Sequence, residues 1–350
     1  MKRIAVVAGD AGGAAALVPV ITELLKTNEL TVALKPYGLA ESIWSDAGLN
    51  MFVNQDSEYD LLLTGTSVNS EMRELDCIKN AHAAGKYSVS LIDFWSNIRE
   101  RFTGKDGSMV LPDALAVLDE GQRKHMVGLG FPDERLFVTG HPLLEDAELF
   151  GKDNKADSLR SKLITQYGLT SSGILVLFAS QPIRKMGYAE KYGFDEVAAC
   201  EDVCAAAKSY GKLEILLLPH PRETSKEVKN KYAHLAGPHF RILKSDLPWE
   251  SVLSADIVIG MNSMLLMEAC LMRKTVISHQ PNLKGQDYLV SNASGWSVST
   301  KSRSELQSAL ESFLTNNTFQ NAHKKVLNSI EIQAGAANRV VSLVLDTNAR

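Results

Sequence analysis

Residues 254–281 join a buried strand, a polar turn and a helix that carries one acid. The β-branched run Ile257–Ile259 predicts the strand, and Gly260–Ser263 predicts the turn. Glu268 then lies about a turn and a half inside the helix. A helix N-terminus after a parallel strand offers unpaired N–H groups to an anion, and an acid one turn deeper can accept hydrogen bonds from sugar hydroxyls. The alternative is an ordinary βαβ unit with a surface Glu.

Acids also follow predicted strands in the N-terminal half. Asp10 lies in a glycine-rich loop, residues 9–13, and is a candidate general base. Asp93 follows a strand predicted over residues 87–92, and the two aromatic residues after it suit the apolar face of a sugar. Helix capping by Asp10, and a cap-and-core role for Asp93, are the alternatives. Glu120 is a weaker candidate of the same kind, better explained as a solvated helix start.

Two further loops carry candidate side chains. His141 precedes Pro142 at the end of the last strand predicted in the N-terminal half, so a turn would fix its imidazole; a purely structural role is the alternative. In the C-terminal half, Ser180 follows one predicted strand, and His220 and Arg222 follow the next. The planar guanidinium of Arg222 can bind two phosphate oxygens, with a solvated Arg as the alternative.

Composition excludes several classes of protein. The 37 Lys and Arg are outnumbered by 41 Asp and Glu, which gives a net charge of −4 and no electrostatic case for nucleic acid. No segment reaches the roughly 20 apolar residues that span a bilayer, so we expect a cytoplasmic protein. The four cysteines form no C-x-x-C pair, and we predict no metal site. The first loop is neither G-x-G-x-x-G nor a P-loop, which disfavours a dinucleotide cofactor.

The elements that must position these residues alternate between strand and helix along the whole chain. This order predicts an α/β protein with two doubly wound, Rossmann-like domains facing across a cleft, because ligands bind outside the carboxyl ends of such strands. We assign residues 1–150 to an N-terminal domain and residues 172–330 to a C-terminal domain. A polar segment, residues 149–172, would connect them, and residues 331–350 would form a closing helix.

Together these motifs resemble the GT-B fold shared by nucleotide-sugar glycosyltransferases and UDP-N-acetylglucosamine 2-epimerases. The first loop is similar to that of MurG-type transferases and lipid A disaccharide synthase, and residues 138–144 resemble the G-[HN]-P stretch that closes the N-terminal domain. Residues 254–281 resemble the donor-binding unit. The resemblance implies that Asn262, Ser263 and Met264 hold a diphosphate and that Glu268 binds the ribose.

Two departures bear on the reaction. MurG-type transferases have paired glycines where this chain has residues 260–263, and the epimerases have an H-R-x-E-N loop where this chain has Ser180-Gln181-Pro182. The resemblance therefore favours a metal-independent glycosyltransferase without a cofactor, with a nucleotide-sugar donor, an unidentified acceptor, and Asp10 or Asp93 as base. The first alternative is a UDP-N-acetylglucosamine 2-epimerase or UDP-sugar hydrolase using Asp93, Glu120 and His141 or His220. The second is a GT-B protein that binds a nucleotide or glycan without chemistry.

Overall fold

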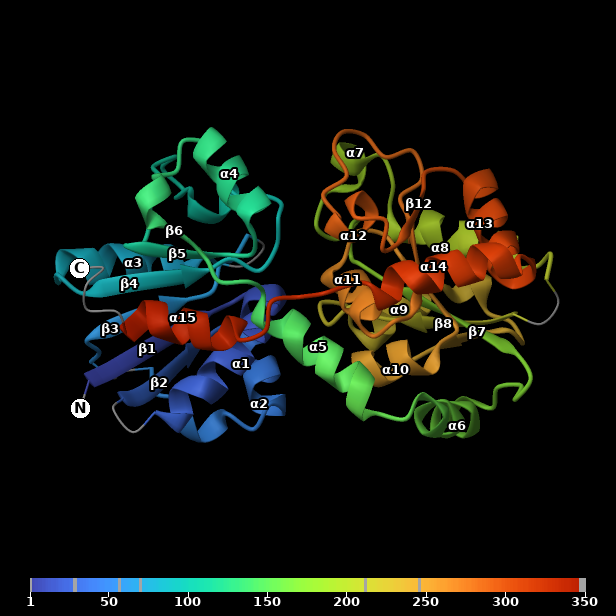
Figure 1. Ribbon diagram of the computed structural model, residues 1–350, viewed down its shortest axis with the longest axis horizontal. Helices are drawn as coiled ribbons and strands as arrows, with labels where there is room; N and C mark the ends of the chain where they lie inside the picture. The colour runs from blue at the N-terminus through green and yellow to red at the C-terminus, as the bar shows by residue number, and fades with distance from the viewer. Residues whose placement is uncertain are drawn as a thin grey trace. The chain divides into compact units, whose positions relative to one another are not determined.

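The computed structural model describes residues 2–27, 30–55, 58–68, 71–210, 213–244 and 247–345. Contacts divide the chain into two compact units (Figure 1). The first comprises Met1–Asp146 and Ile332–Arg350, and the second comprises Ala147–Glu331. Each unit is built around its own six-stranded parallel sheet, so the predicted pair of Rossmann-like domains is confirmed.

The first domain has the strand order β2-β1-β3-β4-β5-β6. Its strands are β1 (Lys2–Ala8), β2 (Leu30–Pro36), β3 (Leu61–Thr64), β4 (Tyr87–Leu91), β5 (Ala114–Val117) and β6 (Leu136–Val138). Its helices are α1 (Ala11–Lys26), α2 (Leu39–Asp46), α3 (Arg73–Ala83), α4 (Glu120–Gly128) and α15 (Ala336–Leu345), and α5 (Pro142–Asp153) leads into the second domain. The order reverses between β1 and β3, which makes the carboxyl ends of these strands the expected ligand edge.

Side chains alternate between the two faces of this sheet, and helices cover both. Ile4 and Val6 of β1 pack in one apolar cluster with α1, α2 and α15, whereas Ala5 and Val7 pack in another with α3 and α4. Burial of both faces explains why the strands appear in the sequence as continuous apolar runs. The closing helix α15 therefore completes the first domain.

The second domain has the strand order β12-β11-β10-β7-β8-β9, which reverses between β7 and β10. Its strands are β7 (Ile174–Ala179), β8 (Leu213–Leu218), β9 (Phe240–Ile242), β10 (Ile257–Gly260), β11 (Thr275–His279) and β12 (Val298–Thr300). Its helices are α6 (Ala156–Tyr167), α7 (Ala189–Tyr192), α8 (Glu196–Ala207), α9 (Ser225–Lys231), α10 (Pro248–Ser254), α11 (Met264–Leu271), α12 (Val290–Ala293), α13 (Arg303–Thr315) and α14 (Asn317–Asn328).

One local prediction is wrong. The glycine-rich segment is not a loop throughout, because α1 begins at Ala11 and contains Gly12 and Gly13. The polar segment expected to connect the domains, residues 149–172, contains the end of α5 and all of α6, and α6 packs against α10.

Within the described residues, no helix is both long and apolar enough to cross a bilayer.

Candidate functional site

Asp10 joins the loops that follow β1 and β3 in the first domain. It occupies the position before α1, but its side chain does not cap that helix. Instead, the Val68 N–H donates to Asp10 Oδ2 at 2.8 Å, and the Asp10 N–H donates to Ser67 Oγ at 3.1 Å. The helix-cap alternative is therefore wrong, and Asp10 lies at the reversal of strand order, where the edge of the sheet is expected to bind a ligand.

A second buried acid, Glu74 of α3, supports the same loops. The Gly9 N–H donates to Glu74 Oε1 at 3.1 Å, and the Ser67 hydroxyl donates to the same oxygen at 2.6 Å. The Tyr37 hydroxyl donates to the other oxygen. Burial raises the pKa of Glu74, more than its hydrogen bonds lower it. Sequence reasoning missed Glu74, because an acid in the first turn of a polar helix resembles a solvated one.

Asp93 is held in a buried ion pair. Its Oδ1 lies 2.5 Å from Arg101 Nη1, and the Thr66 hydroxyl donates to the same oxygen at 3.2 Å. The Asp93 and Arg101 side chains are only 12% and 7% exposed. A Cβ atom at Gly12 would lie 2.0 Å from Asp93 Oδ2, so a glycine in the first turn of α1 is needed for the carboxylate to fit. Arg101 was not a candidate in the sequence, since nothing local pairs it with Asp93.

His141 lies beside Asp93 in the same domain. Its Nε2 is 3.1 Å from the Asp93 carbonyl oxygen, and its buried Nδ1 has no hydrogen-bond partner within the described part of the chain. Burial lowers the pKa of His141, so the imidazole is neutral at pH 7. Glu120, by contrast, is exposed at the start of α4 and pairs with Arg123 at 3.3 Å. Of these candidates, the structure brings Asp93 and His141 together and leaves Glu120 at the surface.

In the second domain, the candidates gather where β7 and β10 end. The Asn262 N–H donates to Gln181 Oε1 at 3.0 Å, which ties together the loops on either side of the reversal in strand order. The Ser180 hydroxyl is buried; it donates to Glu223 Oε2 at 3.1 Å and lies 3.1 Å from the Tyr232 hydroxyl. The Ser180 hydroxyl therefore donates its proton to a residue of the same domain and not to a ligand.

The loop with His220 and Arg222 is fixed by the same buried carboxylate. The His220 N–H donates to Glu223 Oε2 at 3.1 Å, and the Arg222 N–H donates to His220 Nδ1 at 3.1 Å. A neutral His220 thus carries its proton on Nε2. Lys231 lies 2.6 Å from Glu223 Oε1 and 2.5 Å from Glu196 Oε1, so one ammonium serves two carboxylates that are 1% and 0% exposed.

The start of α11 carries an unused hydroxyl. Ser263 precedes the helix, yet its side chain makes no capping bond, and its buried Oγ has no partner among the described residues. The first N–H groups of any helix lack intrahelical acceptors, and those of α11 begin at Met264. An anion at this helix start would satisfy both the hydroxyl and the backbone groups.

Glu268 lies inside the second domain, not on its surface, so the alternative of a surface Glu is wrong. The Trp249 Nε1–H donates to Glu268 Oε2 at 2.5 Å. Burial raises the pKa of Glu268 to about 7, which the Trp249 bond opposes. The described residues provide no hydrogen bond to its other carboxylate oxygen.

Among the described residues, no group of three or more His, Cys, Asp or Glu side chains is placed to hold a metal ion.

Comparison with known proteins finds proteins of similar structure but none of similar sequence. No family model matches the chain, and no curated protein matches it by sequence. Solved structures do match over nearly the full length of both chains. The UDP-GlcNAc 2-epimerase of Neisseria meningitidis bound to UDP-GlcNAc has a TM-score of 0.72 at 12% identity, covering 98% of this chain and 99% of that one.

Two other matches agree with the first. The Methanocaldococcus jannaschii UDP-GlcNAc 2-epimerase in complex with UDP-GlcNAc and UDP has a TM-score of 0.68 at 14% identity, with 98% and 99% coverage. The S. aureus MnaA–UDP co-structure has a TM-score of 0.72 at 13% identity, with 98% and 95% coverage. The two-domain GT-B-like fold is thus confirmed.

These comparisons also correct the expected reaction. The sequence favoured a glycosyltransferase, but several structures that share this fold over nearly their whole length are named as UDP-GlcNAc 2-epimerases. The transferase prediction is therefore contradicted, and the epimerase alternative fits better. The chain therefore has the fold of the UDP-GlcNAc 2-epimerases.

Proposed function

We propose that this protein is an enzyme of the UDP-N-acetylglucosamine 2-epimerase type, acting on a UDP-sugar without a second sugar acceptor. The observation that carries the proposal is the unpartnered Ser263 hydroxyl at the start of α11, beside the reversal between β7 and β10. Open α/β sheets bind ligands at this position. The match to a 2-epimerase bound to UDP-GlcNAc supports a diphosphate as the anion.

In this proposal the second domain binds the nucleotide. The Ser263 hydroxyl and the first N–H groups of α11 donate to the diphosphate, next to the Asn262 backbone that Gln181 fixes. The free oxygen of Glu268 accepts from a ribose hydroxyl, while Trp249 holds the other oxygen. Arg222 adds positive charge from the loop after β8, and together with the helix dipole it offsets charge on a departing diphosphate.

Epimerisation beside the anomeric carbon requires that a proton leave one face of the sugar and return to the other. A base and an acid must therefore be available together. Asp10, Asp93 and the neutral His141 are the candidates in the first domain. Because Asp93 is paired with Arg101, we assign it to holding sugar hydroxyls, and we assign proton transfer to Asp10 and His141.

The activity test uses the purified protein and UDP-N-acetylglucosamine alone in D₂O, followed by NMR. Epimerisation through proton removal puts deuterium on C2 and produces the manno epimer, whereas hydrolysis releases UDP. Asp10→Asn and His141→Gln should each reduce deuterium incorporation at least 100-fold, as expected for loss of an acid–base group. If the protein binds UDP but neither incorporates deuterium into the sugar nor releases free UDP, it is a binding protein without this activity, and the proposed reaction is contradicted.

The nucleotide site is tested separately by calorimetric titration with UDP. Ser263→Ala should weaken UDP binding about 10-fold or more, because hydrogen bonds to charged groups contribute about 1.5–3 kcal/mol. The matched control is Ser302→Ala. Ser302 does cap its helix, accepting from the Glu305 N–H at 3.3 Å, so its loss should lower stability and leave UDP affinity unchanged. Equal UDP affinity in wild type and Ser263→Ala would exclude the site.

A further inference from the structure

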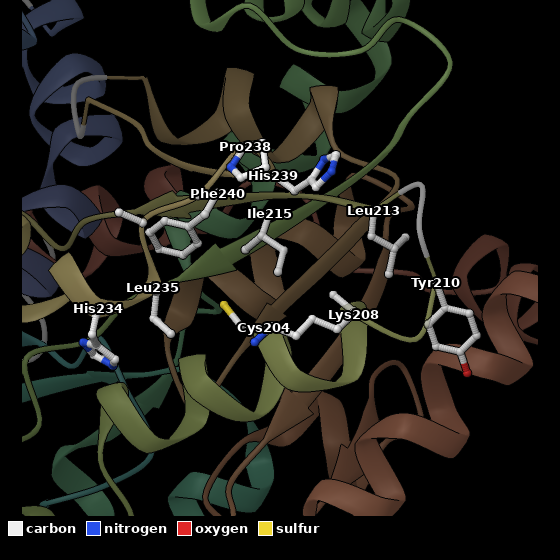
Figure 2. Close-up of a pocket in the computed structure, with 13 residues that line it drawn as sticks. Cys204, Lys208, Tyr210, Leu213, Ile215, His234, Leu235, Pro238, His239 and Phe240 are labelled. Atoms are coloured by element: carbon white, nitrogen blue, oxygen red, sulfur yellow. The ribbon is translucent and has the colours of Figure 1, made fainter.

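A cavity of about 350 Å³ opens in the second domain at the opposite end of the sheet from the candidate site. Its lining includes Leu213 and Phe240, the first residues of β8 and β9, whereas the candidate residues follow the carboxyl ends of their strands. Figure 2 shows the open space between α8 and these strands. Its size is within the range of small-molecule sites.

The walls of this cavity are mainly apolar. Leu213, Ile215, Leu235 and Phe240 face the space from the sheet and from the turn after α9 (Figure 2). Such a lining favours an apolar guest over a strongly hydrated one.

The α8 side of the cavity carries a thiol and an ammonium. Cys204 and Lys208 both come from the C-terminal end of α8 and lie one turn apart. Figure 2 shows the Lys208 side chain running toward Cys204. Cys200 lies one turn earlier on α8. The influence of the Cys200 side chain and of the nearby Lys208 charge lowers the pKa of Cys204, against the opposing effect of burial.

The other three cysteines lie in different surroundings. Cys200 and Cys270 are fully buried, and Cys77 is half-buried. The pKa of Cys200 is raised by the neighbouring Cys204 side chain and by burial, and burial raises the pKa of Cys77 and of Cys270. None of the three lines this cavity. These three cysteines can therefore serve as internal controls when the reactivity of the Cys204 thiol is measured.

We propose that Cys204 is a modification site for apolar electrophiles of the α,β-unsaturated carbonyl class, which the cavity binds beside the thiol. The thiol first loses its proton to water, and the Lys208 ammonium stabilises the thiolate. The sulfur then bonds to the β-carbon, the π pair moves to the α-carbon, and that carbon takes a proton from water. The product is a thioether, and the addition requires no oxidant and no leaving group.

The test treats the folded, full-length protein with substoichiometric N-phenylmaleimide, an apolar member of this class. Peptide mass mapping over time gives a labelling rate for each cysteine. Cys204 should react at least 10-fold faster than Cys77, Cys200 or Cys270. Labelling in denaturant should remove the difference, and Cys204→Ser should remove the fast phase. Faster labelling of Cys77 would overturn the proposal.

Two variants separate the cavity from simple exposure of the thiol. Lys208→Met should slow Cys204 labelling about 3-fold through loss of a nearby cation, whereas Lys226→Met, which removes an exposed lysine on α9, should not change it. Leu235→Gln should reduce the preference for N-phenylmaleimide over N-hydroxyethylmaleimide, which has the same reactive ring but a polar tail. Free N-acetylcysteine gives the reference preference for N-phenylmaleimide over N-hydroxyethylmaleimide. If Cys204 in the wild-type protein shows no greater preference, the cavity does not bind the electrophile and the proposal is wrong.

Discussion

Glu268 is an acid whose surroundings make its charge depend on pH near neutrality. It is buried in the second domain, accepts one hydrogen bond from Trp249, and has a pKa raised by burial to about 7. The ordinary value is 4.5, so the folded protein holds this proton more tightly than the unfolded chain does. The stabilisation linked to this proton is complete below pH 4.5 and is lost as pH rises through about 7.

Glu268→Gln should therefore change how stability depends on pH. The amide keeps a carbonyl oxygen for Trp249 but removes the titration, so the variant should gain stability relative to wild type between pH 5 and pH 8. A shift from 4.5 to about 7 corresponds to about 3 kcal/mol at most. Urea unfolding at the two pH values measures the difference. A constant difference between variant and wild type would show that Glu268 titrates normally.

At the scale of the element, the first turn of α1 is shaped by close packing. A Cβ atom at Gly12 would meet the Asp93 carboxylate, and one at Gly13 would come within 3.2 Å of the Thr66 backbone nitrogen. Asp93 cannot turn away freely, because Arg101 and Thr66 hold it. These glycines thus allow α1 to approach the loops after β3 and β4.

Gly12→Ala and Gly128→Ala form a matched pair within helices. Alanine is the better helix former, so Gly128→Ala, where a Cβ meets nothing within 4 Å, should stabilise the protein by up to about 1 kcal/mol. Gly12→Ala should instead destabilise it by roughly 1–3 kcal/mol, as overpacking does. Thermal unfolding of both variants gives the comparison. A stabilising Gly12→Ala would mean that the Asp93 ion pair rearranges easily.

The same elements show what the sequence could predict. Buried parallel strands such as β1 and β3 appear as apolar runs, so the two sheets and the candidate edges could be predicted from periodicity. The start of α1 could not be predicted in this way, because glycines that permit close packing within a helix have the same sequence pattern as glycines in a loop. Glu74 and Arg101 were missed because their partners, Ser67 and Asp93, are brought to them by tertiary structure. Contacts of this kind leave no local pattern.

At the scale of the whole molecule, the first domain is made from both ends of the described chain. Val340, Val341, Leu343 and Val344 of α15 belong to the apolar cluster that includes α1 and β1. Glu145 accepts from the Gly335 and Ala336 N–H groups at 2.8 and 3.2 Å, which fixes the start of α15. One face of the first sheet is therefore incomplete without residues from the end of the chain.

A variant that ends at Glu331 should retain a folded second domain and lose a stable first domain. Burial of each large aliphatic side chain contributes about 1.5–3 kcal/mol, so removing four approaches the total stability of a typical domain. Calorimetry combined with limited proteolysis should show one surviving transition and cleavage confined to the first domain. Ser342→Asn, on the exposed face of α15, is the control and should leave both domains intact. A truncated chain with a protease-resistant first domain would contradict this prediction.

The return of α15 to the first domain also sets an order of events at the ribosome. Translation proceeds at about 5–20 residues per second, so on the order of 10–40 s separates the synthesis of β6 from that of α15. During this interval the second domain can fold as a unit, while the nascent first domain exposes the apolar sheet face that α15 later covers. This protein is therefore expected to depend on chaperones during synthesis more than its finished, fully packed form suggests.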